Sequence, residues 1–403
     1  LIAIVIRGRA AENRHLICPH SRDRTDHILA ISRPGTAQNR RGNISNVSHT
    51  IGAPSFLPYH RTPQDFVATP SASWLKSARM EHYMTFGPIY QERVWGGQSL
   101  CSAFGRRLPD GCRIGESWEL VDREEAQSVV QEGPFKGWTL HQLWTERRGE
   151  IFGPAFHDQR FPILIKILDA TDRLSVQVHP PAPLAEELQG QPKTEVWYFV
   201  QAQPGAQVYA GLKKGVTRDH LQQALADGVV ENLVHSLPTQ TDTFIFIPSG
   251  RIHAIDRGNL IFEIQQNSDT TYRLFDWNRL DSNGKPRKLH ISESLACTDF
   301  EDVEPALGIP EGEVLASCPH FQVERWELRE ARKANSLPRF AVFQCVAGAV
   351  RNDDATFKPG DLFLIPAFAH DQLIEPEQAG TVVLRTTLPA EDVSPATVSR
   401  EQN

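Results

Sequence analysis

Residues 175–198 read S-V-Q-V-H-P-P-A-P-L-A-E-E-L-Q-G-Q-P-K-T-E-V-W-Y and contain two short segments rich in Val, Trp and Tyr. These residue types favour β-strands, and the prolines and glycine between them are typical of a loop. Alternate side chains of a strand share a face, so Ser175, Gln177 and His179 should point to one side. Glu195 lies in the second segment. The stretch therefore predicts β-structure that carries an amide, an imidazole and a carboxylate.

A further pattern supplies another histidine. Residues 248–253 read P-S-G-R-I-H after the apolar run T-F-I-F-I, so we expect a turn from which His253 re-enters on the next strand. A carboxylate that neighbours His179 across the sheet is the expected third ligand, and Glu195 is the candidate. With Gln177, these donors suit Zn²⁺, with Mn²⁺, Co²⁺ and Fe²⁺ as competitors. The sequence thus predicts an open, catalytic metal site.

A weak internal repeat indicates a doubled β unit from residue 80 onward. F-I-F-I-P-S-G-R-I-H at 244–253 is similar to L-F-L-I-P-A-F-A-H at 362–370. The stretch 299–313, rich in Pro, Gly and acidic residues, reads as a loop between the two units. We therefore predict a mainly β protein with a catalytic domain at 80–300 and a C-terminal, degenerate β domain at 301–403.

Two segments have the signals of helices. The stretch T-L-H-Q-L-W-T-E-R-R-G-E-I-F-G begins at Thr139, after which we expect a helix. The stretch T-R-D-H-L-Q-Q-A-L-A-D-G begins at Thr217, a candidate N-cap. Leu221 and Leu225 fall four residues apart in the second segment, on one helical face. We interpret these segments as a small α-helical insertion in the catalytic domain.

Residues 1–79 differ from the rest of the chain. They contain eleven Lys or Arg against four Asp or Glu, lack sustained apolar periodicity, and precede the only two methionines, Met80 and Met84. We expect a non-native or disordered extension outside the functional fold, with an organellar transit segment as the alternative.

Composition limits the class of partner. The remaining 324 residues carry 31 basic and 45 acidic side chains, which argues against general nucleic-acid binding. No apolar run approaches the roughly 20 residues that span a bilayer. Six cysteines without a C-x-x-C pair predict free thiols in a reducing cytoplasm.

The patterns together resemble a known family. S-x-Q-x-H-P, K-T-E-x-W-Y, P-x-G-x-x-H and the segment E-I-Q-Q-N-S-D-T-T-Y-R-L-F-D-W at 263–277 occur in the order and spacing of type I phosphomannose isomerases. V-W-G-G at 94–97 and G-E-S-W-E at 115–119 are similar to that family's N-terminal signatures. The resemblance covers about residues 84–390. It implies two cupin-like jelly-roll β-barrel units and a zinc-dependent interconversion of mannose 6-phosphate and fructose 6-phosphate.

The resemblance also implies roles for individual residues. It assigns one zinc ion per chain to Gln177, His179, Glu195 and His253. It makes Arg273 the active-site arginine, which we expect to stabilise an enediolate. The other polar positions that it places around the substrate are Lys166, Ser175 and Lys193, and we add Asp269 to the substrate-binding set.

The catalytic base stays open at this point. A nearby cation would lower the pKa of Lys193, two residues before a metal ligand, and Glu263 and Asp269 are rivals. A small sugar phosphate is the expected partner, without nucleic acid or membrane, and a monomer and a homodimer are equally compatible with the sequence. A metal-dependent dioxygenase and a non-catalytic sugar-binding regulator of the same fold are the competing functions.

Overall fold

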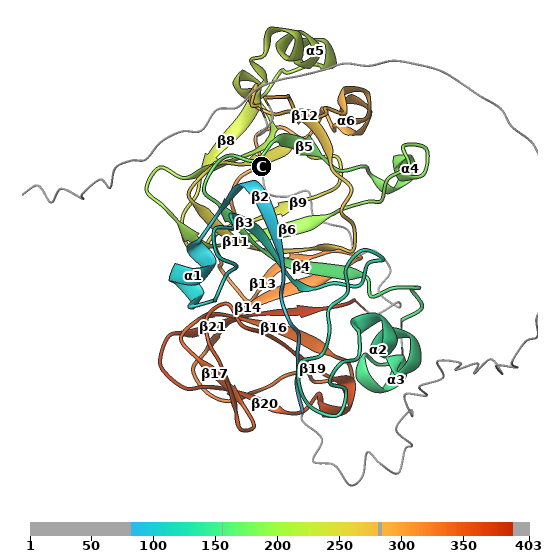
Figure 1. Cartoon of the computed structure of the whole chain (residues 1–403), viewed down its shortest axis with the longest axis vertical. Coiled ribbons are helices and arrows are strands. Elements are labelled where there is room, and N and C mark those ends of the chain that lie inside the picture. Colours follow the sequence, from blue (N-terminus) through green and yellow to red (C-terminus); the bar gives the residue numbers. More distant parts are fainter. Residues whose placement is uncertain (1–81, 155, 281–283, 390–403) are drawn as a thin grey trace, which may run out of the picture. The chain divides into compact units, whose positions relative to one another are not determined.

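The structure, a computed structural model, describes residues 82–154, 156–280 and 284–389, which all belong to one compact unit. The predicted extension, residues 1–79, lies outside the described residues. Four antiparallel sheets dominate the fold, which confirms the mainly β prediction (Figure 1). None of the described helices is long and apolar enough to cross a membrane.

Two sheets are built from residues before 300. The large N-terminal sheet has, in spatial order, strands β2 (Ile89–Gly97), β3 (Ile114–Leu120), β4 (Ile163–Ala170), β11 (Asn259–Gln266), β6 (Glu195–Ala202) and β9 (Phe244–Ile247). The small N-terminal sheet has strands β12 (Tyr272–Phe275), β5 (Val176–Val178), β10 (His253–Ile255), β7 (Gln207–Leu212) and β8 (Val234–Pro238). Apolar side chains such as Phe199 of β6 and Val208 of β7 pack in one cluster between them.

The other two sheets come almost entirely from residues after 313. The large C-terminal sheet has strands β1 (Met84–Thr85), β19 (Leu362–Ile365), β16 (Ala341–Ala347), β21 (Thr381–Thr387), β14 (Gln322–Leu328) and β13 (Val314–Ser317). The small C-terminal sheet has strands β15 (Arg332–Lys333), β20 (Leu373–Pro376), β17 (Val350–Asn352) and β18 (Ala355–Phe357). Because β1 joins the C-terminal sheet, the chain crosses between the sheet pairs twice. The division into domains at 300/301 stays a prediction, and the paired sheets are compatible with two barrel units.

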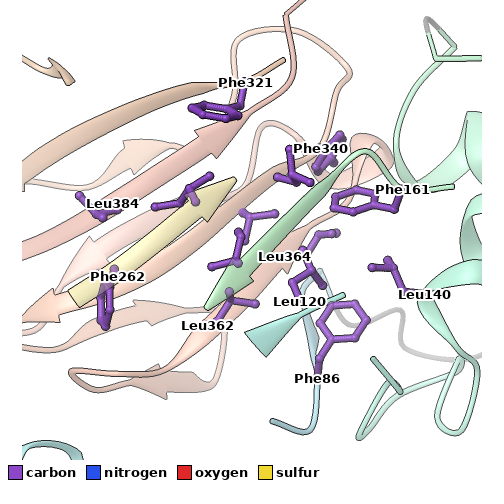
Figure 2. Packing of buried hydrophobic residues seen from close by; sticks show 14 of the residues in the cluster. Phe86, Leu120, Leu140, Phe161, Phe262, Phe321, Phe340, Leu362, Leu364 and Leu384 are labelled. Atoms are coloured by element: carbon purple, nitrogen blue, oxygen red, sulfur yellow. The ribbon is translucent and has the colours of Figure 1, made fainter. Parts of the chain in front are cut away.

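A single apolar cluster joins the two pairs of sheets. The outward face of the large N-terminal sheet contributes Phe262 and Ile264, and the large C-terminal sheet contributes Leu364 and Leu384. Figure 2 shows Phe262 beside the strands that carry Leu362, Leu364 and Leu384. The central strands β4, β11 and β6 of the large N-terminal sheet are therefore buried on both faces, which explains their nearly unbroken apolar runs.

Six short helices accompany the sheets in the described part of the chain. They are α1 (Ser99–Phe104), α2 (Leu140–Glu146), α3 (Arg148–Ile151), α4 (Ala182–Ala185), α5 (Arg218–Asp227) and α6 (Ile291–Cys297). Two short 3₁₀ turns accompany them, Val230–Asn232 and Ala367–Ala369. Leu221 of α5 and Leu295 of α6 pack with Val176 and Leu274 on the outer face of the small N-terminal sheet. Figure 1 shows α6 beside β12 of that sheet.

Both predicted helix starts are confirmed. Thr139 and Thr217 each accept a hydrogen bond from the backbone N–H three residues on and form capping boxes. The second helix ends at Gly228, whose φ of +72° suits glycine. The first predicted helix is interrupted, because Arg147 leaves the helical conformation and separates α2 from α3.

Candidate metal and substrate site

Three potential metal ligands meet between the two N-terminal sheets. Glu195 begins β6, His253 begins β10, and His179 directly follows β5. The carboxylate oxygens of Glu195 lie 3.6 Å from Nε2 of His179 and 3.7 Å from Nε2 of His253. All three side chains are fully buried. Their ligand atoms converge within 4.8 Å of one another, close enough to surround one ion.

Gln177 extends this group from β5. It lies opposite His253 in the β5–β10 register, with its Nε2 3.3 Å from Nε2 of His253. The oxygen and nitrogen of an amide exchange places by a half-turn of the group, so the same position can offer an oxygen. Val176 packs with Leu221 and Leu295 on the outer face of the sheet, whereas Gln177 faces His253, so the predicted alternation of faces is confirmed here.

Glu195 reaches the histidines from the opposite sheet. We expected the carboxylate beside His179 across its own sheet, and that expectation was wrong. Strand β6 pairs with β9 and β11, whereas β5 pairs with β10 and β12. Alternation along a strand predicts which residues share a face, but it does not predict which sheet the strand joins. The cluster consequently connects two sheets that face each other.

The turn after β9 ties the segments of the cluster together. Gly250 has a φ of +96°, a region that L-residues with side chains avoid, and its N–H donates to the carbonyl oxygen of His179 at 2.9 Å. The hydroxyl of Ser249 accepts the backbone N–H of Lys193 at 3.0 Å. The P-x-G turn therefore fixes the Q-x-H and K-T-E segments relative to each other.

The surroundings of the two histidines suit a divalent cation. Nδ1 of His179 lies 2.8 Å from the carbonyl oxygen of Thr270, and Nδ1 of His253 lies 2.9 Å from that of Arg251. These contacts place N–H on Nδ1 and leave the Nε2 lone pairs facing Glu195. Burial lowers the pKa of both imidazoles, to about 3 for His253, so both are neutral.

Several buried polar atoms at this site also bear on whether a metal ion could bind here. Nε2 of His179 and both carboxylate oxygens of Glu195 are buried and have no hydrogen-bond partner among the described residues. Such atoms are rare because desolvation without a hydrogen bond is unfavourable. Neutral imidazoles and an ionised carboxylate are the protonation states that metal binding requires. The residues present therefore fit a metal ion.

A cavity of about 360 Å³ adjoins Gln177. This volume lies within the range of small-molecule sites. The cavity wall contains the remaining residues that the sequence predicted for catalysis or substrate binding, Lys166, Ser175, Lys193, Asp269 and Arg273. The structure thus brings all nine predicted site residues to one place, although their roles stay predictions.

Lys166 lies on this wall among three carboxylates. Its Nζ is 3.4 Å from Oδ1 of Asp269, 3.5 Å from Oε2 of Glu116 and 3.8 Å from Oε2 of Glu263. Lys166 and Glu263 are also opposite each other on β4 and β11. The lysine that interrupts an apolar strand is therefore a buried cation that faces the cavity.

The pKa values of Lys193 and Glu263 are both raised, but for different reasons. Nζ of Lys193 lies 3.1 Å from Oε2 of Glu195. Burial favours the neutral amine, but Glu195 and Glu263 outweigh burial and raise the pKa of Lys193. Burial raises the pKa of the Glu263 carboxyl to about 7. Glu263 also accepts a hydrogen bond from Nε1 of Trp197 at 3.0 Å.

Arg273 is held by neutral groups. Its Nε donates to the hydroxyl of Ser175 at 3.2 Å, and its Nη1 donates to the carbonyl oxygen of Lys288 at 3.0 Å. Burial and the nearby Arg287 lower the pKa of its guanidinium. The carboxylate of Asp276 instead accepts hydrogen bonds from Arg279 and Arg287. Positive charge therefore exceeds negative charge at this end of the cavity.

Sequence reasoning missed several residues that line the cavity, namely Arg93, Trp95, Glu116, Trp197, Arg287 and His290. The V-W-G-G and G-E-S-W-E signatures pointed to Trp95 and Glu116 without suggesting what they contact. Arg287 and His290 lie in an irregular segment with no periodic pattern that could have singled them out.

The chain is similar to proteins of known function. The family model of the phosphomannose isomerase type I catalytic domain matches residues 84–197. The chain is 36% identical over 294 residues to the mannose-6-phosphate isomerase ManA of Bacillus subtilis (strain 168), which covers 70% of this chain and 92% of that protein. It is 35% identical over 288 residues to the mannose-6-phosphate isomerase of Streptococcus mutans, which covers 68% of this chain and 89% of that protein.

Solved structures agree with these relatives. The crystal structure of mannose 6-phosphate isomerase from Bacillus subtilis superposes with a TM-score of 0.68 at 30% identity, covering 76% of this chain and all of that chain. A zinc-bound mannose 6-phosphate isomerase superposes with a TM-score of 0.61 at 16% identity, covering 76% of this chain and all of that chain. At that lower identity, the likeness concerns the fold alone.

Proposed function

This chain belongs to the type I phosphomannose isomerase family and interconverts mannose 6-phosphate and fructose 6-phosphate, and we propose that it does so at one divalent metal ion. The proposed ligands are Gln177, His179, Glu195 and His253. The observation that carries the proposal is the set of buried ligand atoms on His179 and Glu195, beside the cavity, that accept no hydrogen bond from the described residues.

Zinc is the proposed metal. Two imidazoles, one carboxylate and an amide oxygen form a mixed nitrogen and oxygen set that Zn²⁺ accepts, and the set contains no thiolate. When bound, the ion would act as a Lewis acid toward substrate oxygens next to the reacting carbons. The buried neutral histidines support a preformed site. One ion per chain and a cytoplasmic location belong to the same proposal.

The chain's own residues would move the proton between C1 and C2 through a cis-enediol. Of the three candidates for the base, we propose the carboxylate of Glu263. Burial brings its pKa to about 7, near the value that makes an efficient general base at neutral pH. Lys193 is paired with Glu195, so we assign it to stabilise negative charge on the substrate rather than to accept the proton.

Arg273 is the proposed stabiliser of charge on the enediolate oxygen. Its hydrogen bonds to Ser175 and Lys288 fix the guanidinium at the cavity wall without neutralising it. A prepositioned charge of this kind needs little reorganisation when the transition state forms. We propose Lys166, Ser175 and Asp269 as substrate-binding residues, since all three line the same cavity.

A coupled assay with mannose 6-phosphate, run before and after chelation, tests the proposal. We expect activity that disappears when bound metal is removed and returns when Zn²⁺ is restored. Undiminished turnover by protein shown to be free of metal would contradict the metal site while leaving the family assignment intact.

A further inference from the structure

Strand β2 leaves the regular ladder next to the cavity. Glu92 and Gly97 both have Ile114 of β3 as their partner in the register, so residues 93–96 bulge out between two points of contact. We call residues 93–96 the β2 arch. Bulges of this kind change the direction in which side chains point, and they occur often beside active sites.

The β2 arch points two side chains into the cavity. Arg93 and Trp95 line it, whereas Val94 between them is 53% exposed. The backbone N–H of Arg93 donates to the carbonyl oxygen of Arg113, and the N–H of Thr171 donates to that of Trp95, each at 3.0 Å. The arch is therefore anchored to the sheet on both sides of its exposed residue.

Two glycines make room for the arch. A Cβ on Gly115 would lie 2.5 Å from Cβ of Arg93, and a Cβ on Gly96 would lie 2.3 Å from the backbone nitrogen of Gly115. No side chain fits at such distances. The glycines of the V-W-G-G and G-E-S-W-E signatures thus permit the close approach that brings Arg93 over the cavity.

The guanidinium of Arg93 is oriented by two contacts. Its Nε donates to Oε1 of Glu116 at 2.8 Å, and its Nη1 donates to the carbonyl oxygen of Glu92 at 3.2 Å. A guanidinium has five N–H donors, so these bonds leave donors for a ligand. The side chain is 30% exposed on a cavity wall, which leaves it accessible.

Glu116 is placed to hold cations rather than to transfer protons. Its Oε2 accepts Nε1 of Trp118 at 2.7 Å and lies 3.5 Å from Nζ of Lys166, while its Oε1 bonds Arg93. Burial alone would raise the pKa of Glu116, but Lys166 and Arg93 outweigh it and hold the pKa at about 2. Glu116 therefore stays ionised and keeps Arg93 in one orientation.

We propose that Arg93 is a substrate-binding residue that donates hydrogen bonds to hydroxyl oxygens of the sugar, with Glu116 as its positioning residue. The proposal rests on the isomerase function above and adds a contact that sets substrate affinity. Sugar oxygens are the better match because Glu116 balances the charge of Arg93. The excess of positive charge that suits a phosphate dianion lies elsewhere in the cavity, beside Arg273 and Arg287.

Steady-state kinetics of the full chain with zinc bound test this assignment. Arg93→Met keeps an unbranched side chain out to the position of Nε but removes the guanidinium and its donors. We expect the KM for mannose 6-phosphate to rise about ten- to a hundredfold with kcat changed by less than about threefold, as for an interaction made equally in ground and transition states. The inhibition constant of inorganic phosphate should stay unchanged, and Arg93→Lys should recover part of the affinity. A parallel rise in that inhibition constant would overturn the sugar assignment.

Arg113→Met is the matched control. Arg113 supports the same arch, because its Nε donates to the carbonyl oxygen of Gly96 at 3.1 Å, but it does not line the cavity. We expect its KM to change by less than about twofold. An equal rise in KM for both variants would mean that the shape of the arch matters and not the donors of Arg93, and would overturn the proposal. A fall in kcat at constant KM in Arg93→Met would do the same, whereas inactivity of the unmodified chain would count against the isomerase function itself.

Discussion

Oε1 of Glu195 lies 3.7 Å from Nε2 of His253, although strands β6 and β10 belong to opposite sheets. An ion held by both side chains would bind the two N-terminal sheets to each other. His179, Glu195 and His253 are fully buried, so the folded chain presents them preassembled and the unfolded chain does not. Binding to the folded state alone stabilises that state by mass action.

The first prediction is that metal binding raises the melting temperature. Glu195→Gln keeps the shape of the side chain but removes the charge, so we expect loss of bound zinc, of activity and of the stabilisation by zinc. That stabilisation is about 4 kcal/mol when free zinc exceeds its Kd about a thousandfold. Elemental analysis and thermal unfolding with and without chelator measure both effects. The exposed Glu187→Gln is the control, and zinc retained by Glu195→Gln would contradict the ligand assignment.

The second prediction concerns the base. Glu263→Gln should lower kcat by about 10²- to 10⁴-fold while zinc stays bound. Only the ionised carboxylate accepts a proton, so kcat of the unmodified enzyme should rise with pH toward the pKa of about 7, and the variant should lose this rise. Asp269→Asn is the comparison, because it removes the rival carboxylate. If Asp269→Asn loses the pH dependence and Glu263→Gln keeps it, the base is Asp269.

The third prediction separates catalysis from structure at Arg273. Arg273→Lys keeps a positive charge but cannot reproduce the two fixed hydrogen bonds to Ser175 and Lys288. We expect kcat to fall about ten- to a hundredfold with full zinc content, since the charge is no longer prepositioned. Elemental analysis of the variant distinguishes a catalytic from a structural role, because a loss of zinc would mean that Arg273 supports the structure of the metal site.

The sequence predicted which residues form the site better than it predicted how the strands that carry them pair. Alternation placed Gln177 and His179 on one face, and P-x-G-x-x-H predicted the start of β10 at His253. Alternation could not show that Glu195 arrives from the facing sheet, because pairing of strands depends on contacts far apart in the chain.

Irregular backbone explains the residues that were missed. Arg93 reaches the cavity only because the register of β2 and β3 shifts at Glu92, and a regular strand would have placed its side chain otherwise. The buried role of Lys166 followed from three carboxylates on three other segments, which no local pattern could reveal. Long-range pairing and bulges therefore set the limit of the sequence reasoning.

The fourth prediction tests whether the two pairs of sheets depend on each other. Phe262 of β11 is fully buried in the cluster shared with the large C-terminal sheet (Figure 2). Its ring centroid lies 5.9 Å from that of Phe104. Phe262→Ala should lower the free energy of unfolding by about 3–5 kcal/mol, because neighbouring side chains refill only part of the space left by the deleted ring. Urea unfolding followed by tryptophan fluorescence measures the change.

The location of Phe262 gives this prediction a second, sharper part. Phe262 and Glu263 are successive residues of one strand, so their side chains point to opposite faces, one into the shared cluster and one into the cavity. At urea concentrations below its unfolding transition, the Phe262→Ala variant should therefore keep its zinc. It should still unfold in a single transition, with the midpoint at a lower urea concentration. Leu280→Ala, at a side chain that is 64% exposed, should leave stability nearly unchanged. Two separate transitions, with only one of them shifted, would mean that the sheet pairs unfold independently and would support the division near residue 300.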